Sequence, residues 1–507
     1  MAHRALRIAA FLAAATCAAA PSLADKASDT LNIAWNADPQ TIDPYQGATR
    51  EGNIIVHHVF DALLFRDPDT SEYKPALATA YRWVDDTTLE FDLRRGVKFH
   101  NGDPFSAEDV VFTFNTITKK DFPIILRSLA DWIKGAEKID DYKVRVTLNK
   151  PFPAALEYFS LPLRIYPKAY FEKVGAEQFT RAPVGTGPYK VVELVAGKSI
   201  VLERFDDHYA GSPKGRPAIK RLNMRVMPEM ATQIAELMTG GLDWTWRVTP
   251  DQAAKLAGRG NLVSLEAETM RFSLLSFDAA ARAGKSPMQD LRVRRAFAHA
   301  INRQELRDNL VKGASRVIHS GCYPTQFGCT DDVVKYDYDP AKAKALLAEA
   351  GYPDGFEITL LSYGGTFRIE SEAVVNYMRA VGVRINPQML QSPTVRQKMS
   401  NSEAQLVHMH WGSDSVNDVA RSAGQYFDFS PYDMARDPQV RDWLLEAQST
   451  TDSEKRKAAY KKALQRIAEQ VYWLPMTTFV TNYTFVNTLD FKPSYDEYPR
   501  FFFARWK

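Results

Sequence analysis

The segment from residue 408 to residue 414, HMHWGSD, concentrates side chains that could bind a ligand. His408 and His410 are two positions apart, so on a strand both rings face the same side and could reach one metal ion. Because no clear third ligand accompanies them, packing or hydrogen bonding of the two rings is the favoured interpretation. Asp414 suits a different chemistry, since in a closed, low-dielectric site a carboxylate attracts a ligand ammonium strongly. Asp418 is a rival carboxylate for the same role.

Two arginines are candidates for holding a ligand carboxylate. Arg271 and Arg368 each lie beside an aromatic residue, Phe272 and Phe367 respectively. A guanidinium can bind a carboxylate through two parallel hydrogen bonds, and this pairing is the chemistry that would give them a role. A surface arginine that contacts no ligand is the alternative.

The sequence lacks the motifs of common hydrolases and nucleotide-binding proteins. It contains no HExxH, no GxSxG and no P-loop, and the glycines of residues 183–189, PVGTGPY, do not match a phosphate-binding loop. The formal net charge of +3, with no clustered basic run, argues against a nucleic-acid partner. At 507 residues, 45% hydrophobic and 25% charged, the chain has an ordinary globular composition and is long enough for two or three lobes.

The N-terminus predicts export through a cleavable signal. An apolar run over residues 8–20 follows basic residues and is too short to span a bilayer, and residues 22–24, SLA, suit signal peptidase. The residues before Cys17 do not match a lipoprotein signal. We therefore expect residues 1–24 to be removed and the mature protein to be periplasmic.

Cys322 and Cys329 remain in the mature chain and bracket a loop in the sequence GCYPTQFGC. In an oxidising compartment this arrangement favours a disulfide. Two buried thiols are the alternative. A metal pair is less favoured, because no further Cys or His lies close in sequence.

The elements that must position these side chains can be followed from residue 89 to residue 114. Apolar and polar residues alternate over residues 89–93, which predicts a strand with one buried face. Residues 101–104, NGDP, are dense in turn-forming residues. Ser106 can cap a helix that continues through the apolar residues 110–114. By itself this unit indicates a globular domain and no function.

This stretch resembles the signature of the bacterial extracellular solute-binding proteins of family 5, the dipeptide, oligopeptide and nickel receptors of ABC importers. Residues 94–102, RRGVKFHNG, and 106–110, SAEDV, match it almost residue for residue. Their charges look surface-facing, so we interpret the signature as a marker of the fold. Further matches along the chain are residues 60–64 (FDALL), 183–189 (PVGTGPY), 290–297 (DLRVRRAF) and 338–340 (YDP).

The resemblance implies an α/β, two-lobed periplasmic binding protein fold of type II, similar to cluster C. Two crossing segments would join the lobes at a hinge, and an extra small domain would be inserted in the first lobe. Ligands would bind in the crevice and be enclosed by hinge closure. The implied boundaries are residues 25–58, 182–285 and 470–507 for lobe I, residues 59–181 for the inserted domain, and residues 286–469 for lobe II.

The resemblance also implies a function. A periplasmic receptor would capture a peptide or peptide-like solute and deliver it to an inner-membrane ABC permease, as a monomer without a cofactor. In peptide-binding relatives, a Trp followed three positions later by an Asp lies in the cleft, and the Asp pairs with the ligand's α-ammonium. Trp411 and Asp414 match this spacing, and Arg271 and Arg368 fall in segments that border the cleft in relatives.

Other ligands stay open at this point. Peptide receptors often carry Asp-Tyr where this chain has Asp414 followed by Ser415. This departure leaves room for another cationic solute, such as an opine-like or polyamine-derived compound. The nickel receptors of the family keep a metal or metallophore in view for His408 and His410. A secreted hydrolase is the alternative from a different class of protein.

Overall fold

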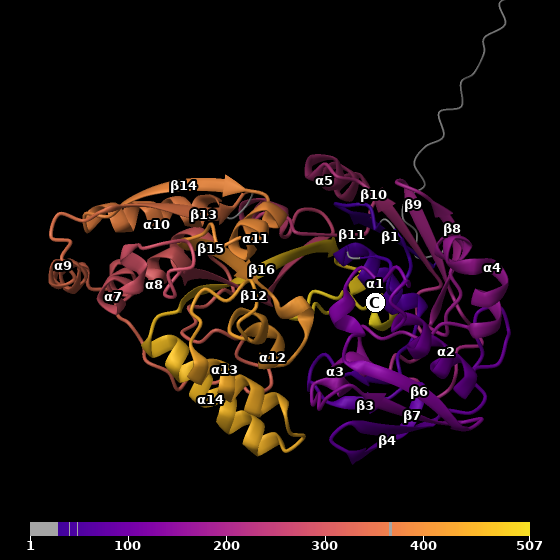
Figure 1. Ribbon diagram of the computed structural model, residues 1–507. Coiled ribbons are helices and arrows are strands. Elements are labelled where there is room, and N and C mark those ends of the chain that lie inside the picture. Colours follow the sequence, from indigo (N-terminus) through magenta and orange to yellow (C-terminus); the bar gives the residue numbers. More distant parts are fainter. Residues whose placement is uncertain (1–28, 40, 48, 365–367) are drawn as a thin grey trace, which may run out of the picture.

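The chain forms two lobes that lie side by side (Figure 1). This computed structural model describes residues 29–39, 41–47, 49–364 and 368–507. The predicted signal peptide, residues 1–24, lies outside the described residues. Within the described ranges, no helix is long and apolar enough to cross a membrane.

A ten-stranded mixed sheet runs through both lobes. Two long strands belong to both: β12 (Leu262–Phe277) and β16 (Trp473–Val486). The first lobe adds β1 (Thr30–Trp35), β8 (Tyr189–Val195), β9 (Ser199–Arg204), β10 (Arg221–Val226) and β11 (Trp244–Trp246). The second lobe adds β13 (Glu357–Tyr363), β14 (Arg384–Leu390) and β15 (Leu406–Trp411). The order across the sheet is β14-β13-β15-β12-β16-β11-β1-β10-β9-β8.

The remaining elements cover this sheet or extend the first lobe. A four-stranded sheet in the first lobe contains β4 (Ala78–Asp85), β5 (Thr88–Leu93), β7 (Lys143–Leu148) and β6 (Ile133–Asp140), in that order. The two-stranded ladders are β2 (Leu64–Arg66) with β3 (Tyr73–Pro75), and β17 (Leu489–Asp490) with β18 (Arg505–Trp506). The helices of the first lobe are α1 (Arg50–Val59), α2 (Ala107–Ile117), α3 (Ala155–Ser160), α4 (Lys168–Arg181), α5 (Met230–Thr239) and α6 (Pro250–Leu256). Those of the second lobe are α7 (Leu291–Ala300), α8 (Arg303–Leu306), α9 (Pro340–Glu349), α10 (Arg368–Ala380), α11 (Ser392–Ser400), α12 (Val419–Ser422), α13 (Pro438–Gln448) and α14 (Ser453–Glu469).

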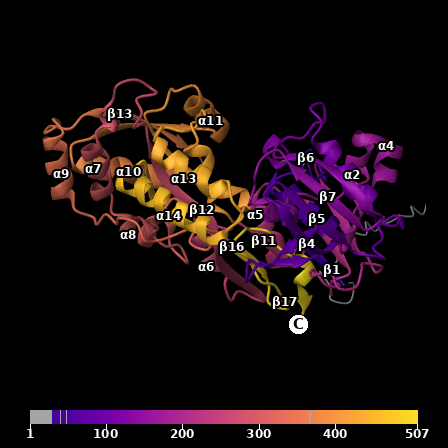
Figure 2. The ribbon, with the colours of Figure 1, turned by 60° about the horizontal axis from the view of Figure 1, so that its bottom comes forward.

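The two crossing strands connect separate hydrophobic cores. The start of β12, up to Ala267, packs on the core of the first lobe, whereas Phe272 and the residues after it pack on the two cores of the second lobe. Pairing between β12 and β16 loses its regular register between Glu268 and Phe272, and again before Leu274. The irregularity lies where the strands pass between the lobes (Figure 1 and Figure 2). A disrupted ladder at this place is a natural point for bending.

The strand and helix predicted around residue 100 are confirmed as β5 and α2, with Ser106 as the N-cap of α2. The alternation along β5 differs from the prediction at Glu90, which is buried. Arg82 and Arg145 pair with its carboxylate from both sides, at 2.5 and 2.8 Å, and shield it from water. Glu90, at a position where the pattern predicts exposure, is therefore buried as an ion-paired side chain.

Two of the matched motifs pack against each other. The backbone N–H of His100 donates to the carbonyl of Gly185, and the ring Nε2 of His100 donates to the carbonyl of Gly187, both at 2.9 Å. A Cβ added at Gly185 or Gly187 would lie within 2.4 Å of a carbonyl oxygen at the end of α1. Only glycine allows the chain to pass so close to that helix.

Candidate functional site

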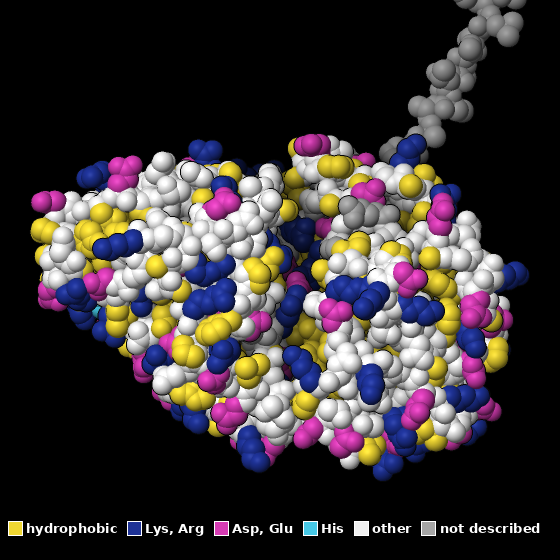
Figure 3. Space-filling model, in the orientation of Figure 1, with side chains coloured by type: hydrophobic (Ala, Val, Ile, Leu, Met, Phe, Trp, Pro, Cys, Tyr) yellow, Lys and Arg dark blue, Asp and Glu magenta, His cyan; other side chains and the backbone are white. Residues whose placement is uncertain are grey.

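All of the predicted site residues except Arg368 lie on or near a turn between the lobes. β15 ends at Trp411, and the turn of residues 412–418 connects it to α12. The side chain of Val416, in this turn, packs in the hydrophobic core of the first lobe although the flanking elements belong to the second. Figure 3 shows that the surface is hollowed between the two lobes, with basic side chains in the hollow.

The turn has an unusual backbone. Ser413, Asp414 and Ser415 have φ angles of 52°, 49° and 64°, in the left-handed region that non-glycine residues rarely adopt. Each such residue costs about 1–2 kcal/mol. Two hydrogen bonds close the turn, from the N–H of Ser415 to the carbonyl of Gly412 at 2.9 Å and from the N–H of Val416 to the carbonyl of Ser413 at 2.8 Å. Such a conformation persists only where surrounding contacts fix it.

Groups of the first lobe supply those contacts. Arg50 donates to the hydroxyl of Ser415 at 2.8 Å, and that hydroxyl donates to the carbonyl of Asp496 at 2.9 Å. The guanidinium of Arg66 donates to the carbonyl of Ser415 at 3.1 Å. One residue of the turn therefore has three hydrogen bonds to the first lobe.

The same region of the first lobe holds a buried ion cluster. Arg66 pairs with Glu157, and its second terminal nitrogen lies 2.9 Å from the carboxylate of Asp496. Glu157 also accepts the backbone N–H of Asn417 at 3.0 Å. The cluster thus binds the far end of the turn as well, and the turn is anchored at both ends.

Asp414 presents its carboxylate at the edge of this arrangement. Its side chain is 48% exposed and pairs with Arg421, whose Nε lies 3.0 Å from Oδ2. The Arg421 guanidinium also lies over the ring of Trp411, 5.6 Å from the ring centroid. The indole N–H of Trp411 donates to the carbonyl of Arg421 at 3.3 Å. The structure therefore brings Trp411 and Asp414 together, with Arg421 as an additional partner.

Asp418 has a different environment. It is buried and caps α12, accepting the N–H of Ala420 at 2.9 Å. Its carboxylate pairs with Arg456 at 2.6 Å and accepts the hydroxyl of Tyr460 at 3.0 Å. All of these partners belong to the second lobe, so the role that the geometry gives Asp418 is internal.

Arg271 lies beside the turn and Arg368 does not. The stem of Arg271 covers Gly412 so closely that an added Cβ there would lie 2.6 Å from Cγ of the arginine. Its guanidinium pairs with Glu497 at 2.8 Å. Arg368 begins α10, is 68% exposed and pairs with Glu372, one turn further along the helix. Its predicted aromatic neighbour Phe367 lies outside the described residues.

An arginine group that the sequence did not reveal surrounds Glu497. Burial alone would raise the pKa of the Glu497 carboxyl, but the guanidiniums of Arg271, Arg50 and Arg247 hold that pKa below its usual range. Burial also lowers the pKa of Arg247, although Glu51 pairs with it at 3.0 Å. Three guanidiniums with two carboxylates leave a net positive charge beside the turn. Its members are far apart in sequence, so no local pattern could have linked them.

The two histidines share one face of β15, as predicted from their spacing. His408 is buried, its Nδ1 lies 2.6 Å from the Ser371 hydroxyl, and its Nε2 lies 3.5 Å from the Glu370 carboxylate. The ring of His410 packs edge-on against Tyr363, and burial lowers the pKa of His410 to about 3. In the part of the chain that is described, no group of three His, Cys, Asp or Glu side chains is placed to hold a metal ion.

The predicted disulfide is confirmed. Cys322 and Cys329 are bonded, with their Cα atoms 5.8 Å apart. The loop that they close lies in the second lobe, against the turn of residues 412–418.

Comparison with known proteins gives this architecture a context. The chain is 26% identical over 465 residues to the heme-binding protein A of Haemophilus influenzae, covering 84% of this chain and 82% of that protein. It is 28% identical over 479 residues to the glutathione-binding protein GsiB of Salmonella choleraesuis, covering 91% of each. The structure of HbpA2 from Haemophilus parasuis superimposes with a TM-score of 0.83 at 22% identity, covering 94% of this chain and all of that one.

The fold expected from the sequence is therefore confirmed as the cluster C type of periplasmic binding proteins. The sequence profile described as "Bacterial extracellular solute-binding proteins, family 5 Middle" matches residues 72–431, more than two-thirds of the chain. Proteins of this family bind solutes and are not enzymes, as the absence of hydrolase motifs predicted. The chain belongs to the bacterial extracellular solute-binding proteins of family 5.

Proposed function

We propose that this protein is the periplasmic receptor of an ABC importer and that it captures a small peptide or peptide-like solute between its lobes. The observation that carries the proposal is the pairing of opposite charges around one turn. The half-exposed carboxylate of Asp414 and the positively charged group of Arg50, Arg247 and Arg271 lie in the same neighbourhood between the lobes. A molecule with an ammonium and a carboxylate complements such a site.

The ligand's ammonium would bind Asp414, beside the ring of Trp411. Asp414 already shares its charge with Arg421, so the ligand would join this pair. The ligand's carboxylate would bind Arg271, whose guanidinium has donors beyond those that Glu497 accepts. Burial of the rest of the ligand between the lobes would supply most of the binding free energy, as in other enclosed sites.

The net positive charge of the arginine group narrows the class of solute. It favours a ligand with at least as many carboxylates as ammonium groups, such as a peptide, a glutathione-like peptide or an opine-like compound. A polyamine-derived ligand fits less well, because its ammonium groups would add to the positive charge of the arginine group. Export by a signal cleaved after Ala24, a monomeric state and delivery to an inner-membrane permease complete the proposal.

The test is to identify what the protein holds. The mature protein is purified from its native host without refolding, denatured, and the released solute analysed by mass spectrometry and elemental analysis. A peptide or amino-carboxylate solute is the expected result. Stoichiometric nickel or heme, or a polyamine that lacks carboxylates, would overturn the proposal. Isothermal titration with a dipeptide, glutathione, heme and nickel–histidine then ranks the same classes on solute-free protein.

A further inference from the structure

The disulfide-closed loop, residues 322–329, is bound to the ligand-binding turn by three hydrogen bonds. Gln326 donates from its side-chain amide to the carbonyl of Val416 at 2.9 Å. The backbone N–H of Phe327 donates to the carbonyl of Asn417 at 3.2 Å, and the carbonyl of Phe327 accepts the N–H of Val419 at 3.1 Å. The loop therefore runs beside residues 416–419 like a short parallel strand, and it holds the turn from the second lobe.

The side chain of Gln326 makes this contact specific. It is buried, and its carbonyl oxygen accepts the backbone N–H of Tyr323 at 2.8 Å while its amide reaches Val416. One residue thus joins the start of the loop to the turn. The next residue, Phe327, lies under the guanidinium of Arg456, 4.4 Å from its ring centroid, and the same guanidinium pairs with Asp418. The loop is consequently fixed to both ends of the segment between Val416 and Asp418.

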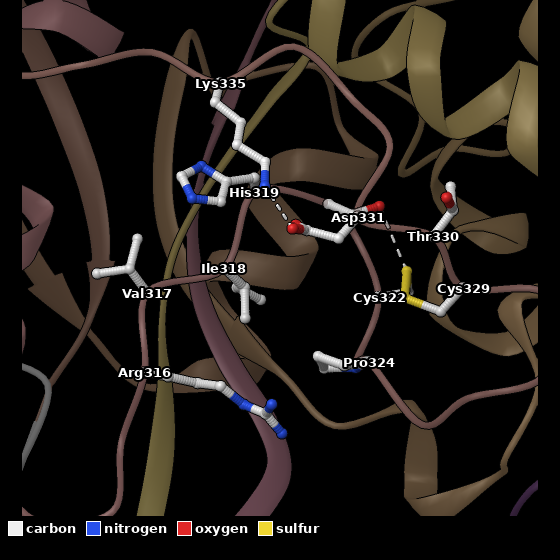
Figure 4. Close-up of a pocket in the computed structure, with 11 residues that line it drawn as sticks. Arg316, Val317, Ile318, His319, Cys322, Pro324, Cys329, Thr330, Asp331 and Lys335 are labelled. Atoms are coloured by element: carbon white, nitrogen blue, oxygen red, sulfur yellow. Dashed lines mark hydrogen bonds and ion pairs between the residues drawn. A yellow bond between two sulfur atoms is a disulfide. The ribbon is translucent and has the colours of Figure 1, made fainter.

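A cavity of about 310 Å³ lies beside the disulfide (Figure 4). Both cysteines line it, together with Ile318, His319 and Lys335. Its volume matches that of the smaller ligand pockets of proteins, which is enough for a small thiol. Cys322 is buried and Cys329 is half-buried, so Cys329 is the sulfur that a small reductant in this cavity would meet first.

We propose that the disulfide-closed loop is a positioning element for the ligand-binding turn, acting through Gln326 and Phe327. The turn has three consecutive left-handed residues, and a conformation of this kind needs supports on every side. The first lobe supplies one set of supports, and the closed loop supplies the other. The disulfide limits the conformations of the loop, so reducing it weakens the hydrogen bonds by which the loop supports the turn.

Reduction by dithiothreitol provides the perturbation. One thiolate of the reagent attacks a cysteine sulfur, the S–S bond breaks, and a mixed disulfide forms. The second thiol of the reagent then closes its own ring, so two electrons and two protons pass to the protein and leave two cysteine thiols. An effect of reduction on ligand binding rests on the proposed function, whereas its effect on the turn does not.

Hydrogen exchange of the full mature protein without ligand tests the positioning. After reduction, amides of residues 415–419 should exchange roughly tenfold faster or more, while those of β13, in the same lobe, stay unchanged. The variant Gln326→Met keeps the disulfide and similar volume but loses both side-chain hydrogen bonds, and it should reproduce the faster exchange. Unchanged exchange in the reduced protein and in Gln326→Met overturns the inference, as does an equal increase throughout the second lobe.

Titration with the dipeptide Ala-Phe separates this inference from the proposed function. Weaker binding together with faster exchange at residues 415–419 supports both. Faster exchange with unchanged affinity upholds the positioning role but overturns the placement of the ligand at the turn. Lost affinity with unchanged exchange overturns the positioning role, since the loop would then act on the ligand by another route.

Discussion

Replacing each of the two neighbouring aspartates by asparagine should separate ligand binding from folding stability. Asparagine is the right substitute at position 414, because it tolerates the left-handed backbone that an alanine would strain. At position 418 it can still cap α12 through its side-chain oxygen. In both variants the change is therefore confined to the loss of a negative charge.

The structure predicts different free-energy costs for losing these two negative charges. The pair between Asp414 and Arg421 is half-exposed, and such pairs contribute about 0.2–1 kcal/mol. A hydrogen bond from a ligand ammonium to this carboxylate contributes about 1.5–3 kcal/mol, so Asp414→Asn should weaken binding about 10- to 150-fold. Asp418→Asn leaves the buried guanidinium of Arg456 without its charge partner, which costs about 3–5 kcal/mol of stability.

Urea unfolding of the ligand-free variants measures the stability, and isothermal titration with the solute released from the native protein measures the affinity. Asp442→Asn is the matched control, since Asp442 forms an exposed pair with Arg441 on α13, away from the turn. The reasoning is refuted if Asp414→Asn binds like the wild type while Asp418→Asn keeps its stability and loses the ligand.

Three further perturbations test the surroundings of the site. Gly412→Ala should displace the stem of Arg271 and cost about 1–3 kcal/mol in urea unfolding; an unchanged midpoint would contradict the close packing. Arg271→Gln should weaken binding of a dipeptide about 10- to 100-fold but leave binding of its methyl ester unchanged, and equal effects on both would exclude a carboxylate contact. Burial lowers the pKa of His58 to about 3, and its Nε2 accepts the N–H of Phe501. The contribution of neutral His58 to the free energy of unfolding is complete above pH 6.5, and it is lost as the pH falls toward 3, by about 1.4 kcal/mol per pH unit. Urea unfolding between pH 7 and 4.5 measures the slope, to which other buried histidines such as His57 and His100 also contribute, and His58→Gln should make it shallower by about 1.4 kcal/mol per pH unit.

The local pattern predicted what depends on neighbouring residues. The strand ending at Leu93, the capped helix after Ser106 and the disulfide all follow from short spacings, and each is present. The segment around Asp414 could be identified from its composition, but its left-handed backbone could not. No glycine or asparagine occupies residues 413–415, and contacts from the other lobe impose that conformation.

The arginine group escaped prediction for the same reason. Arg50, Arg247 and Glu497 come from three distant parts of the chain and meet only because the sheet brings α1, β11 and the C-terminal segment together. Asp418 shows the complementary difficulty: it lies only four positions from Asp414 and was a rival for the same role, yet its partner Arg456 lies on a helix 38 positions away. Sequence spacing could propose both carboxylates but could not rank them.

The first lobe contains segments from distant parts of the sequence, and this has a consequence for its folding during synthesis. β1 (Thr30–Trp35) lies two strands from β16 (Trp473–Val486), and Trp35 packs against Phe501 at a ring distance of 6.3 Å. Segments so far apart in sequence can meet only after nearly all of the chain has been made, and such long-range pairing is slow. The lobe whose first strand is synthesised earliest therefore completes its folding last. A chain cut off before Phe501 would leave Trp35 and Trp244 without one of the aromatic residues that both contact.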